Sequence, residues 1–508
     1  MSGAGRGPGP GGGRAEGALA IVLHTHMPYV EGFGTWPFGE EWLWEAMASC
    51  YLPLLDLLER GAPLTLSLTP VLCDQLQAPG IGERFERFVR EVRSHTHAED
   101  ARGLRAGGHE RLACEVERSW SDYERALERF AQCGGDLLGA LAPYAQWTSS
   151  ATHAVLPLLA SEAALRLQVR SGVDSHRARF GDAWRGGFWL PECAHVPALE
   201  PALADAGVHA TCVELTGRLG LGAPAHLRPL VGEAGVVLAP IDRASIALVW
   251  SDGGYPANGG YRDYHRHTIH HHNPWANDGD AYDHERALAL ARGHAADFVA
   301  RVRERLRRDG GEHPGGGLVL CALDTELLGH WWYEGLHWLA AVVEECERQG
   351  LQLMRLDDAL RRHEPLDARA AARGDGDADA GTAEMSAAAG PPSRERDWGA
   401  STWGAGGDLS TWSGPAVAEI AFGTRAAELE VMRAGTAAGE AAVRELLALQ
   451  SSDWAFMVAR ELAVPYARER FAHHRAALTR ALEEGAAADT AALRNLAVYA
   501  DRAALLAP

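Results

Sequence analysis

Short apolar runs that end in polar residues alternate along this chain with longer stretches of helical periodicity. Residues 18–23 (ALAIVL) form the first apolar run, and residues 40–61 then repeat apolar side chains every three to four positions, as a helix does. Residues 63–76 begin as a second strand. Strand, helix and strand in this order predict an α/β fold with a parallel sheet.

Four later apolar runs have the same character. Each is short, is followed by polar or charged residues, and is predicted to be a strand: residues 187–195 (GFWLPECAH), 208–215, 235–242 and 317–326. In parallel barrels the chemistry takes place at the carboxyl ends of the strands, where the strand-to-helix loops converge. We therefore expect the polar residues that end these runs to carry function.

The chain divides into four predicted segments. Residues 1–17 are Gly-rich and are predicted to be a disordered tail, and residues 18–365 to form a catalytic barrel with a helical insertion at about 82–135. Residues 366–396 are rich in Ala, Gly and Asp and cannot bury enough apolar surface to fold, which predicts a disordered linker. Residues 397–508 are predicted to be a helical C-terminal domain.

Composition and charge exclude several classes of partner. The formal net charge is −20, so the average surface repels nucleic acid and anionic lipid, and we expect neither as a partner. The eight cysteines form no CxxC pair, which excludes a zinc ribbon or a dithiol redox motif. The N-terminal residues lack the apolar region of a signal peptide, and no apolar run is long enough to cross a membrane. A cytoplasmic protein, monomeric or a small homo-oligomer, is the expectation.

Two carboxylates follow predicted strands that converge on one rim. Glu192 lies in FWLPECAH and Asp324 in LVLCALDTE, about 130 residues apart in sequence. A retaining glycoside-cleaving enzyme needs such a pair, one carboxylate as nucleophile and the other as general acid and base. The alternative interpretation is that each acid only caps a helix or pairs with an arginine.

Histidines supply a second candidate chemistry. His24 and His26 end the first strand two positions apart, so both side chains point to the same side of the sheet. His153 and the run at 265–272 add further imidazoles. Such histidines could hydrogen-bond sugar hydroxyls or ligate zinc, so a metal-dependent polysaccharide deacetylase stays an alternative. The histidine-rich run is typical of a loop, and we expect neither a metal nor another cofactor.

Tryptophan is unusually frequent, with sixteen residues against eleven phenylalanines. Several lie close in sequence to the histidines and carboxylates just named, and others follow in the C-terminal segment. Indole rings beside carboxylates at a barrel rim are typical of an oligosaccharide groove. The predicted sugar-stacking residues are Trp36, Trp42, Trp189, Trp275, Trp403 and Trp412.

Six ordered motifs carry a resemblance to a known family. HTHMPYV, WPFGEEWLWEAM, WLPECAH, LDTELLGHWWYEG, STWGAGGDLSTW and SSDWAFM resemble glycoside hydrolase family 57, and most of all its 1,4-alpha-glucan branching enzymes. The similarity covers residues of about 18–365 and 395–480. It implies a (β/α)7 barrel with a helical insertion and an all-helical C-terminal domain, acting on an α-glucan such as glycogen or amylose.

The resemblance also implies roles for single residues. Glu192 would be the nucleophile and Asp324 the general acid/base of a retaining mechanism. Matched positions that line the donor subsite or the substrate groove are His24, His26, His153, Trp42, Trp275, Trp403 and Trp412. Asp453 lies within the matched motif SSDWAFM.

One departure from the family bears on the reaction. Branching members carry a tyrosine in a flexible loop over the site, whereas residues 223–245, the corresponding stretch here, contain none. An α-1,4-glucan hydrolase or a 4-alpha-glucanotransferase with the same carboxylate pair is therefore the alternative to a branching enzyme. A non-catalytic glucan-binding protein is a further alternative, against which the retention of both carboxylates argues.

Overall fold

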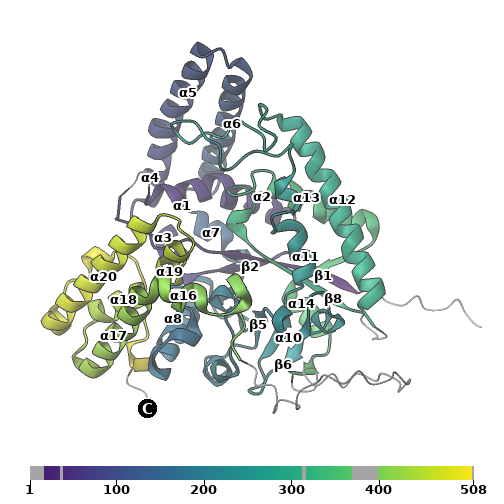
Figure 1. Cartoon of the computed structure of the whole chain (residues 1–508). Coiled ribbons are helices and arrows are strands. Elements are labelled where there is room, and N and C mark those ends of the chain that lie inside the picture. Colours follow the sequence, from purple (N-terminus) through teal and green to yellow (C-terminus); the bar gives the residue numbers. More distant parts are fainter. Residues whose placement is uncertain (1–16, 35–37, 312–315, 369–398, 506–508) are drawn as a thin grey trace, which may run out of the picture.

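Parallel strands form a barrel at the centre of the protein in the computed structural model (Figure 1). The described residues are 17–34, 38–311, 316–368 and 399–505. Within them seven parallel strands run around the barrel in the order β8-β1-β2-β3-β4-β5-β7, and the Asp242 amide after β7 donates to the Leu320 carbonyl of β8 at 2.8 Å. Their bounds are β1 Ala18–Thr25, β2 Thr65–Leu68, β3 Ala145–Ser149, β4 Gly187–Trp189, β5 Ala210–Val213, β7 Val237–Pro240 and β8 Leu318–Asp324.

Strands β1 and β8 pair over their full length and set the level of the site. Nearly every side chain of both is buried, as expected for parallel strands covered on both faces. Their register places His24 directly opposite Asp324. The carboxyl ends of these two strands therefore present an imidazole and a carboxyl group side by side.

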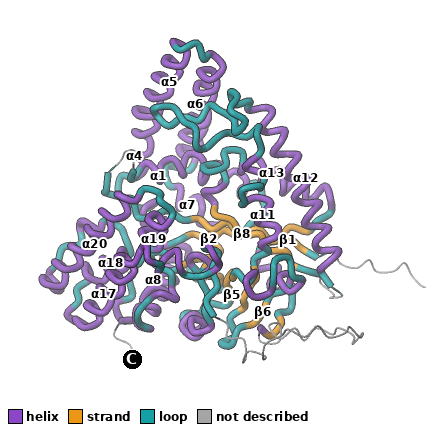
Figure 2. Tube along the Cα trace, in the orientation of Figure 1, coloured by secondary structure: helices purple, strands orange, loops and turns teal. Residues whose placement is uncertain are grey.

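Helices surround the strands and cover the outside of the barrel (Figure 2). The long helices α12 and α13 pack against each other beside β8. The helices between or after the barrel strands are α1 Glu41–Ala46, α2 Leu52–Glu59, α3 Pro70–Leu76, α7 Leu137–Leu141, α8 Glu162–Phe180, α9 Glu200–Asp205, α10 Thr216–Leu219, α11 Arg243–Val249, α12 His284–Asp309, α13 Gly335–Gln349 and α14 Leu356–Arg362.

A helical insertion separates β2 from β3. It comprises α4 Ile81–Arg87, α5 Ser94–Ala106 and α6 Glu110–Gln132, and α5 and α6 form the hairpin that projects at the top of Figure 1. Helix α6 is amphipathic, with Leu112, Val116 and Phe130 among its buried residues. These bounds fall within the region of about 82–135 that the helical periodicity predicts, apart from the first residue of α4.

The C-terminal segment folds into helices that pack on one side of the barrel. They are α16 Ser410–Ser413, α17 Ala418–Ala434, α18 Glu440–Leu449, α19 Ser452–Ala459 and α20 Val464–Glu484. Backbone hydrogen bonds fix this segment to the rim, because the Trp403 amide donates to the Glu192 carbonyl at 3.1 Å and the Ser452 amide to the His153 carbonyl at 3.1 Å. The helical segment therefore packs against the carboxyl ends of the barrel strands.

Three short strands lie outside the ring. β6 Leu230–Val231 is antiparallel to β7, β9 Gln352–Met354 pairs with β1, and β10 Leu366–Asp367 pairs with β6. Residues 366–367, predicted to begin the linker, are thus part of the sheet, while residues 369–396 and 1–16 of the predicted linker and tail lie outside the described residues. Among the described helices none is long and apolar enough to cross a membrane.

A buried ion pair joins the barrel to the C-terminal residues. Asp74 on α3 pairs with Arg179 on α8 at 2.5 Å and accepts a hydrogen bond from the Ala497 amide at 2.6 Å, and both charged side chains are buried. We predict that Asp74→Ala lowers the free energy of unfolding by about 3–5 kcal/mol, because it leaves the Arg179 guanidinium buried without its partner. Urea denaturation monitored by circular dichroism measures the loss.

The control is the pair of Asp56 and Arg129, whose charged atoms lie 2.6 Å apart and in which the Asp56 side chain is 55% exposed. Since water screens Asp56 and Arg129 keeps Glu59 as a second partner at 2.6 Å, Asp56→Ala is expected to cost less than about 1 kcal/mol. Equal losses in the two variants would contradict the importance assigned to the Asp74 contact.

Candidate active site

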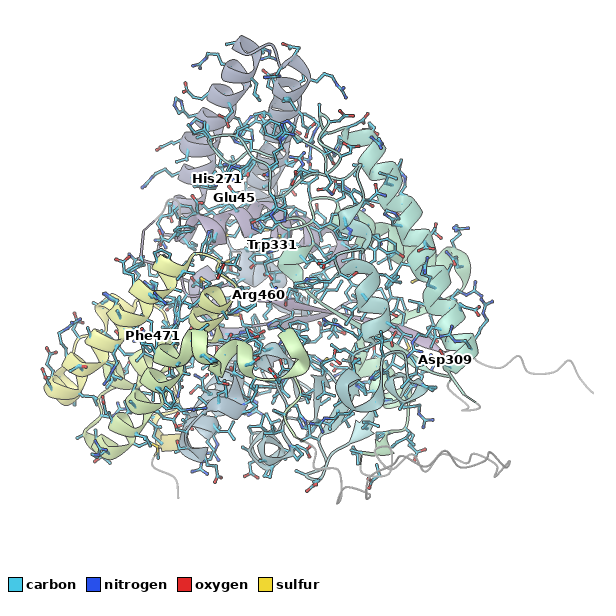
Figure 3. All side chains as sticks on the ribbon, in the orientation of Figure 1. Glu45, His271, Asp309, Trp331, Arg460 and Phe471 are labelled. Carbon is cyan, nitrogen blue, oxygen red and sulfur yellow. The ribbon has the colours of Figure 1, made fainter. Side chains whose placement is uncertain are left out.

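A cavity of about 1480 Å³ opens at the carboxyl ends of the barrel strands. The barrel, the helical insertion, the loop with the histidine-rich run and the C-terminal helices all contribute to its walls. Figure 3 labels four lining residues, His271, Glu45, Trp331 and Arg460, which run from the insertion towards the C-terminal helices. Glu192 and Asp324 both line this cavity.

Glu192 is held in an unusual backbone conformation directly after β4. Its φ is +62° and that of Cys193 is +50°, in the left-handed region that side chains with a Cβ rarely adopt. Two side chains from the C-terminal segment hold its carboxylate: the Trp403 indole donates to Oε2 at 3.1 Å and the Ser452 hydroxyl to Oε1 at 3.0 Å. Backbone strain at a sharply turned carboxylate is typical of functional sites.

Asp324 ends β8 in a different electrostatic setting. Burial raises the pKa of its carboxyl group well above the usual range, and the nearby carboxylates of Glu326 and Glu192 raise it further. Burial also raises the pKa of Glu192, but the hydrogen bonds from Trp403 and Ser452 favour its charged form. The surroundings therefore hold a proton on Asp324 more strongly than on Glu192.

Three imidazoles form a stack beneath the carboxylates. His24, His26 and His153 lie with ring centroids between 3.9 and 6.0 Å apart, and His24 also stacks on Trp189 at 4.5 Å. His24 Nε2 and His153 Nε2 lie 2.9 Å apart, and His153 Nδ1 lies 2.9 Å from the Ser452 hydroxyl oxygen. The stack thus connects β1 to the serine that holds Glu192.

The hydrogen bonds determine the tautomers of His24 and His153. Because Ser452 gives its proton to Glu192, its oxygen accepts from Nδ1–H of His153. Burial and the neighbouring imidazoles keep the pKa of His153 well below its usual value, so the ring is neutral and its Nε2 accepts from His24. The hydrogen bonds therefore all point the same way: His24 donates to His153, His153 to Ser452, and Ser452 to Glu192.

The pKa of His26 is shifted upward, whereas those of His24 and His153 are lowered. Burial lowers its pKa, but Asp453, 2.9 Å from Nε2, together with Glu326 and Glu192 outweighs that effect and raises the pKa above the usual value. His26 Nδ1 lies 3.2 Å from the Thr69 hydroxyl oxygen. The carboxyl groups around His26 thus favour the protonated form of its imidazole.

His26, His153 and Asp453 also satisfy a distance criterion for a metal site, with one ligand atom of each within 4.8 Å of the others. Both ring nitrogens of His26 and both of His153, however, already have hydrogen-bond partners. A histidine that ligates zinc binds the ion through one ring nitrogen and keeps a hydrogen bond at the other, so an ion here would replace one of the two contacts that each ring makes. The geometry fits a hydrogen-bonded network.

The predicted tryptophans are distributed unevenly. Trp42, Trp403 and Trp412 line the cavity, whereas Trp189 is fully buried and supports His24 from behind. Trp275 is not among the described residues that line the cavity, and the Arg266 guanidinium lies over its ring, 4.4 Å from the centroid.

Trp36 lies outside the described residues.

The structure places further residues in the cavity wall or in contact with Glu192 that the sequence analysis did not single out as site residues. Trp250 is half-exposed and lies 6.4 Å from Trp403, centroid to centroid. Ser452 holds Glu192, and Glu326 accepts from the Tyr51 hydroxyl at 2.6 Å and from the His26 amide at 3.2 Å. In the sequence, Ser452 and Glu326 could have been recognised only by their positions, since Ser452 precedes Asp453 and Glu326 lies two residues after Asp324.

The tyrosine-free stretch takes a position away from the cavity. Within residues 223–245, β6 and β7 form a short antiparallel pair that extends towards β10. Of this stretch only Arg243 is among the described cavity-lining residues. It therefore forms no lid over the carboxylates.

Comparisons with known proteins agree with this geometry. A model of glycosyl hydrolase family 57 matches residues 146–370, and a model of the C-terminal part of 1,4-alpha-glucan branching enzyme matches residues 424–502. A probable 1,4-alpha-glucan branching enzyme of Mycobacterium tuberculosis is 31% identical over 545 residues, covering 96% of this chain and 96% of the relative.

Two archaeal proteins are similar over most of the chain. A 1,4-alpha-glucan branching enzyme of Thermococcus kodakarensis is 29% identical, over 90% of this chain and 72% of its own length. The crystal structure of a branching enzyme of the same family from Pyrococcus horikoshii superposes with a TM-score of 0.80 at 29% identity, covering 92% of this chain and 91% of that one. With its barrel, its carboxylate pair and these similarities, the chain belongs to glycosyl hydrolase family 57.

Proposed function

We propose that this chain is a retaining enzyme that cleaves an α-1,4 bond of a glucan and transfers the released segment to a 6-hydroxyl group, as a branching enzyme does. The observation that carries the proposal is that Glu192 and Asp324 face one cavity in different settings: burial raises the pKa of both, but two donors favour the charged form of Glu192, whereas nearby carboxylates favour the protonated form of Asp324. Two carboxyl groups with separated pKa values can act as nucleophile and acid. The similarity to named branching enzymes supports the choice of substrate.

In the first step a Glu192 oxygen attacks the anomeric carbon. The C1–O4 bond breaks, and Asp324 gives its proton to the departing oxygen, which leaves as the free 4-hydroxyl of the shortened chain. The product is a glycosyl ester of Glu192. Trp403 and Ser452 hold the attacking carboxylate in one orientation throughout this step.

In the second step the 6-hydroxyl of an acceptor chain attacks the same carbon. Asp324, now ionised, takes the hydroxyl proton, the bond between C1 and Glu192 breaks, and an α-1,6 bond forms. The net result exchanges one glycosidic bond for another, and both carboxyl groups return to their starting protonation states.

The remaining cavity residues would bind the sugar units. We assign His24, His26, His153 and Asp453 to the donor sugar next to Glu192, since they line the cavity beside it. Trp42, Trp250, Trp403 and Trp412 supply apolar faces for further units. All eight cysteines are free thiols, which supports a reducing, cytoplasmic setting.

Hydrolysis is the second candidate, and one observation favours it. Residues 223–245 do not cover the cavity, so this stretch does not keep water from the glycosyl ester. A water molecule in place of the acceptor hydroxyl would then release a reducing end. Closure of a site over a reactive intermediate is what favours transfer over hydrolysis.

The test of the function is incubation with amylose. We expect new α-1,6 proton signals in NMR spectra, growing faster than the released reducing ends measured in the same samples. A preparation that releases reducing ends without α-1,6 signals would instead assign the protein to the hydrolases.

The role of Glu192 is tested in the same assay. Glu192→Gln is expected to lower both transfer and hydrolysis by about 10⁴-fold or more, because an amide does not form the glycosyl ester. Glu347→Gln, the same substitution at an exposed position on α13, should leave activity unchanged. Near-normal turnover of Glu192→Gln, with unchanged circular dichroism, would refute the assignment.

The pH profile of activity should be bell-shaped. Activity falls at low pH as Glu192 gains a proton and at high pH as Asp324 loses one. Burial and then the Glu326 charge raise the pKa of Asp324, and Glu326 has its own pKa raised by burial to about 7. Glu326→Gln removes that charge, so the alkaline limb of kcat/KM should move to lower pH by about one unit. An unmoved alkaline limb would show that Glu326 does not act on the acid.

Chelation separates this mechanism from metal-dependent deacetylation. We expect EDTA to leave transfer and hydrolysis of amylose unchanged, because no step needs a cation. Loss of activity with EDTA and its recovery with zinc would mean that His26, His153 and Asp453 bind a metal ion.

A further inference from the structure

The loop after β8 presents an exposed indole to the cavity. Trp331 is 44% exposed although it lies inside the cavity wall, and the ring of Tyr264 lies 4.4 Å from it, tilted by 39°. His330 packs edge-on against both rings at 5.5 Å. Trp331, Tyr264 and His330 together form an aromatic surface that we call the Trp331 platform, and Trp331 lies at the centre of the view in Figure 3.

The backbone holds Trp331 in place. Its amide donates to the Glu326 carbonyl at 3.2 Å, and the neighbouring Trp332 amide donates to the Leu327 carbonyl at 2.8 Å. Gly329 has a φ of +109° and lies so close to the Ser49 carbonyl that a Cβ would meet it at 2.1 Å. The exposed indole thus projects from a tightly hydrogen-bonded turn.

Tyr264 is fixed from the other side, by the loop that carries the histidine-rich run. The Asn273 side chain donates to the Tyr264 carbonyl at 3.0 Å, and the Arg262 amide donates to Glu334 at 3.2 Å. The Arg262 guanidinium lies 3.8 Å above the Tyr333 ring. Two separate loops therefore bring their aromatic rings together without burying them.

Polar groups surround the platform in the way that a sugar requires. Glu45, held by Arg93 at 3.1 Å, and the imidazoles of His267 and His271 line the same part of the cavity. A pyranose ring presents an apolar face to an aromatic ring and hydroxyl groups to such donors and acceptors. The chemistry of the platform matches a glucose unit of an oligosaccharide.

The position of the platform indicates which chain it binds. Trp331 lies on the loop that begins directly after Asp324, whereas Trp403 contacts Glu192 from the C-terminal segment. The general acid/base faces the departing oxygen and later the acceptor hydroxyl, so its own loop lies on the acceptor side of the bond. We propose that the Trp331 platform is an acceptor-binding subsite, which stacks a glucose unit of the acceptor chain while its 6-hydroxyl is aligned with the glycosyl ester. This inference rests on the proposed function.

The experiment compares transfer and hydrolysis at increasing concentrations of maltoheptaose added as acceptor to a fixed amount of amylose. In Trp331→Ala the half-saturating concentration of acceptor should rise by about tenfold, because one stacked ring is lost. The share of hydrolysis should rise as well, because the acceptor is bound less often. The KM for amylose as donor should stay unchanged. Trp331→Phe keeps a stacking face and should remain close to the unsubstituted protein.

The control is Phe422→Ala on α17, which removes a 68% exposed ring that is not among the described cavity-lining residues. This variant should behave like the unsubstituted protein. An unchanged acceptor dependence in Trp331→Ala would overturn the inference, as would a raised donor KM with the balance of transfer and hydrolysis intact.

Failure of the proposed function has a different signature. If the unsubstituted protein forms no α-1,6 bonds from amylose, the branching assignment fails, and the platform is judged by binding alone. Maltoheptaose is then titrated into Glu192→Gln with and without Trp331→Ala, with intrinsic fluorescence and calorimetry as readouts. Equal affinities would overturn the platform as a glucan subsite, and a tenfold weaker affinity would support it.

Discussion

The Glu192 carboxylate accepts hydrogen bonds from two side chains that the C-terminal segment brings to the barrel, Trp403 and Ser452. Neither donor is near Glu192 in sequence, and the strand that carries Glu192 is only three residues long. The carboxylate of Glu192, the proposed nucleophile, therefore receives these two hydrogen bonds only when the helical segment packs on the rim. Backbone hydrogen bonds at the same two residues fix that packing, so the integrity of the site and the association of the two parts depend on the same contacts.

The electrostatics of the site depend on this packing as well. His153 donates to Ser452 and accepts from His24, which connects the carboxylate to the first barrel strand through neutral imidazoles. Asp324 lies at the same level of the sheet as His24, and burial together with the neighbouring carboxylates raises its pKa. The groups around the two acids thus favour the different protonation states that the proposed roles require, because a donor stabilises a charge that a neighbouring carboxylate opposes.

The cavity reaches well beyond the two acids. Aromatic rings from the C-terminal segment line it, and the Trp331 platform lines it too; in Figure 3 Trp331 lies below the helical insertion. A transferase has to place two chains at one carbon atom, and a cavity with stacking surfaces from separate segments suits that requirement. The insertion and the histidine-rich loop add further residues to its walls.

The amino-acid sequence by itself determined the α/β class, the helical insertion and the two acids, because strand and helix periodicity is local and each acid directly follows an apolar run. It also determined the histidine pair, since alternation along a strand places both rings on one side. The sequence did not predict the environment of Trp275 correctly. Arg266 lies over its ring, and Trp250 lines the cavity whereas Trp275 does not.

Only the tertiary structure decided which groups surround each acid. Ser452 reaches Glu192 across 260 residues, Tyr51 reaches Glu326 across 275, and Tyr264 meets Trp331 from a different loop. Burial and long-range neighbours set a pKa value and the exposure of a ring, and both depend on how distant segments pack together. For that reason the sequence showed the residue types of the site, and its resemblance to a family implied their roles, whereas the hydrogen bonds and the burial that distinguish the two acids exist only in the tertiary structure.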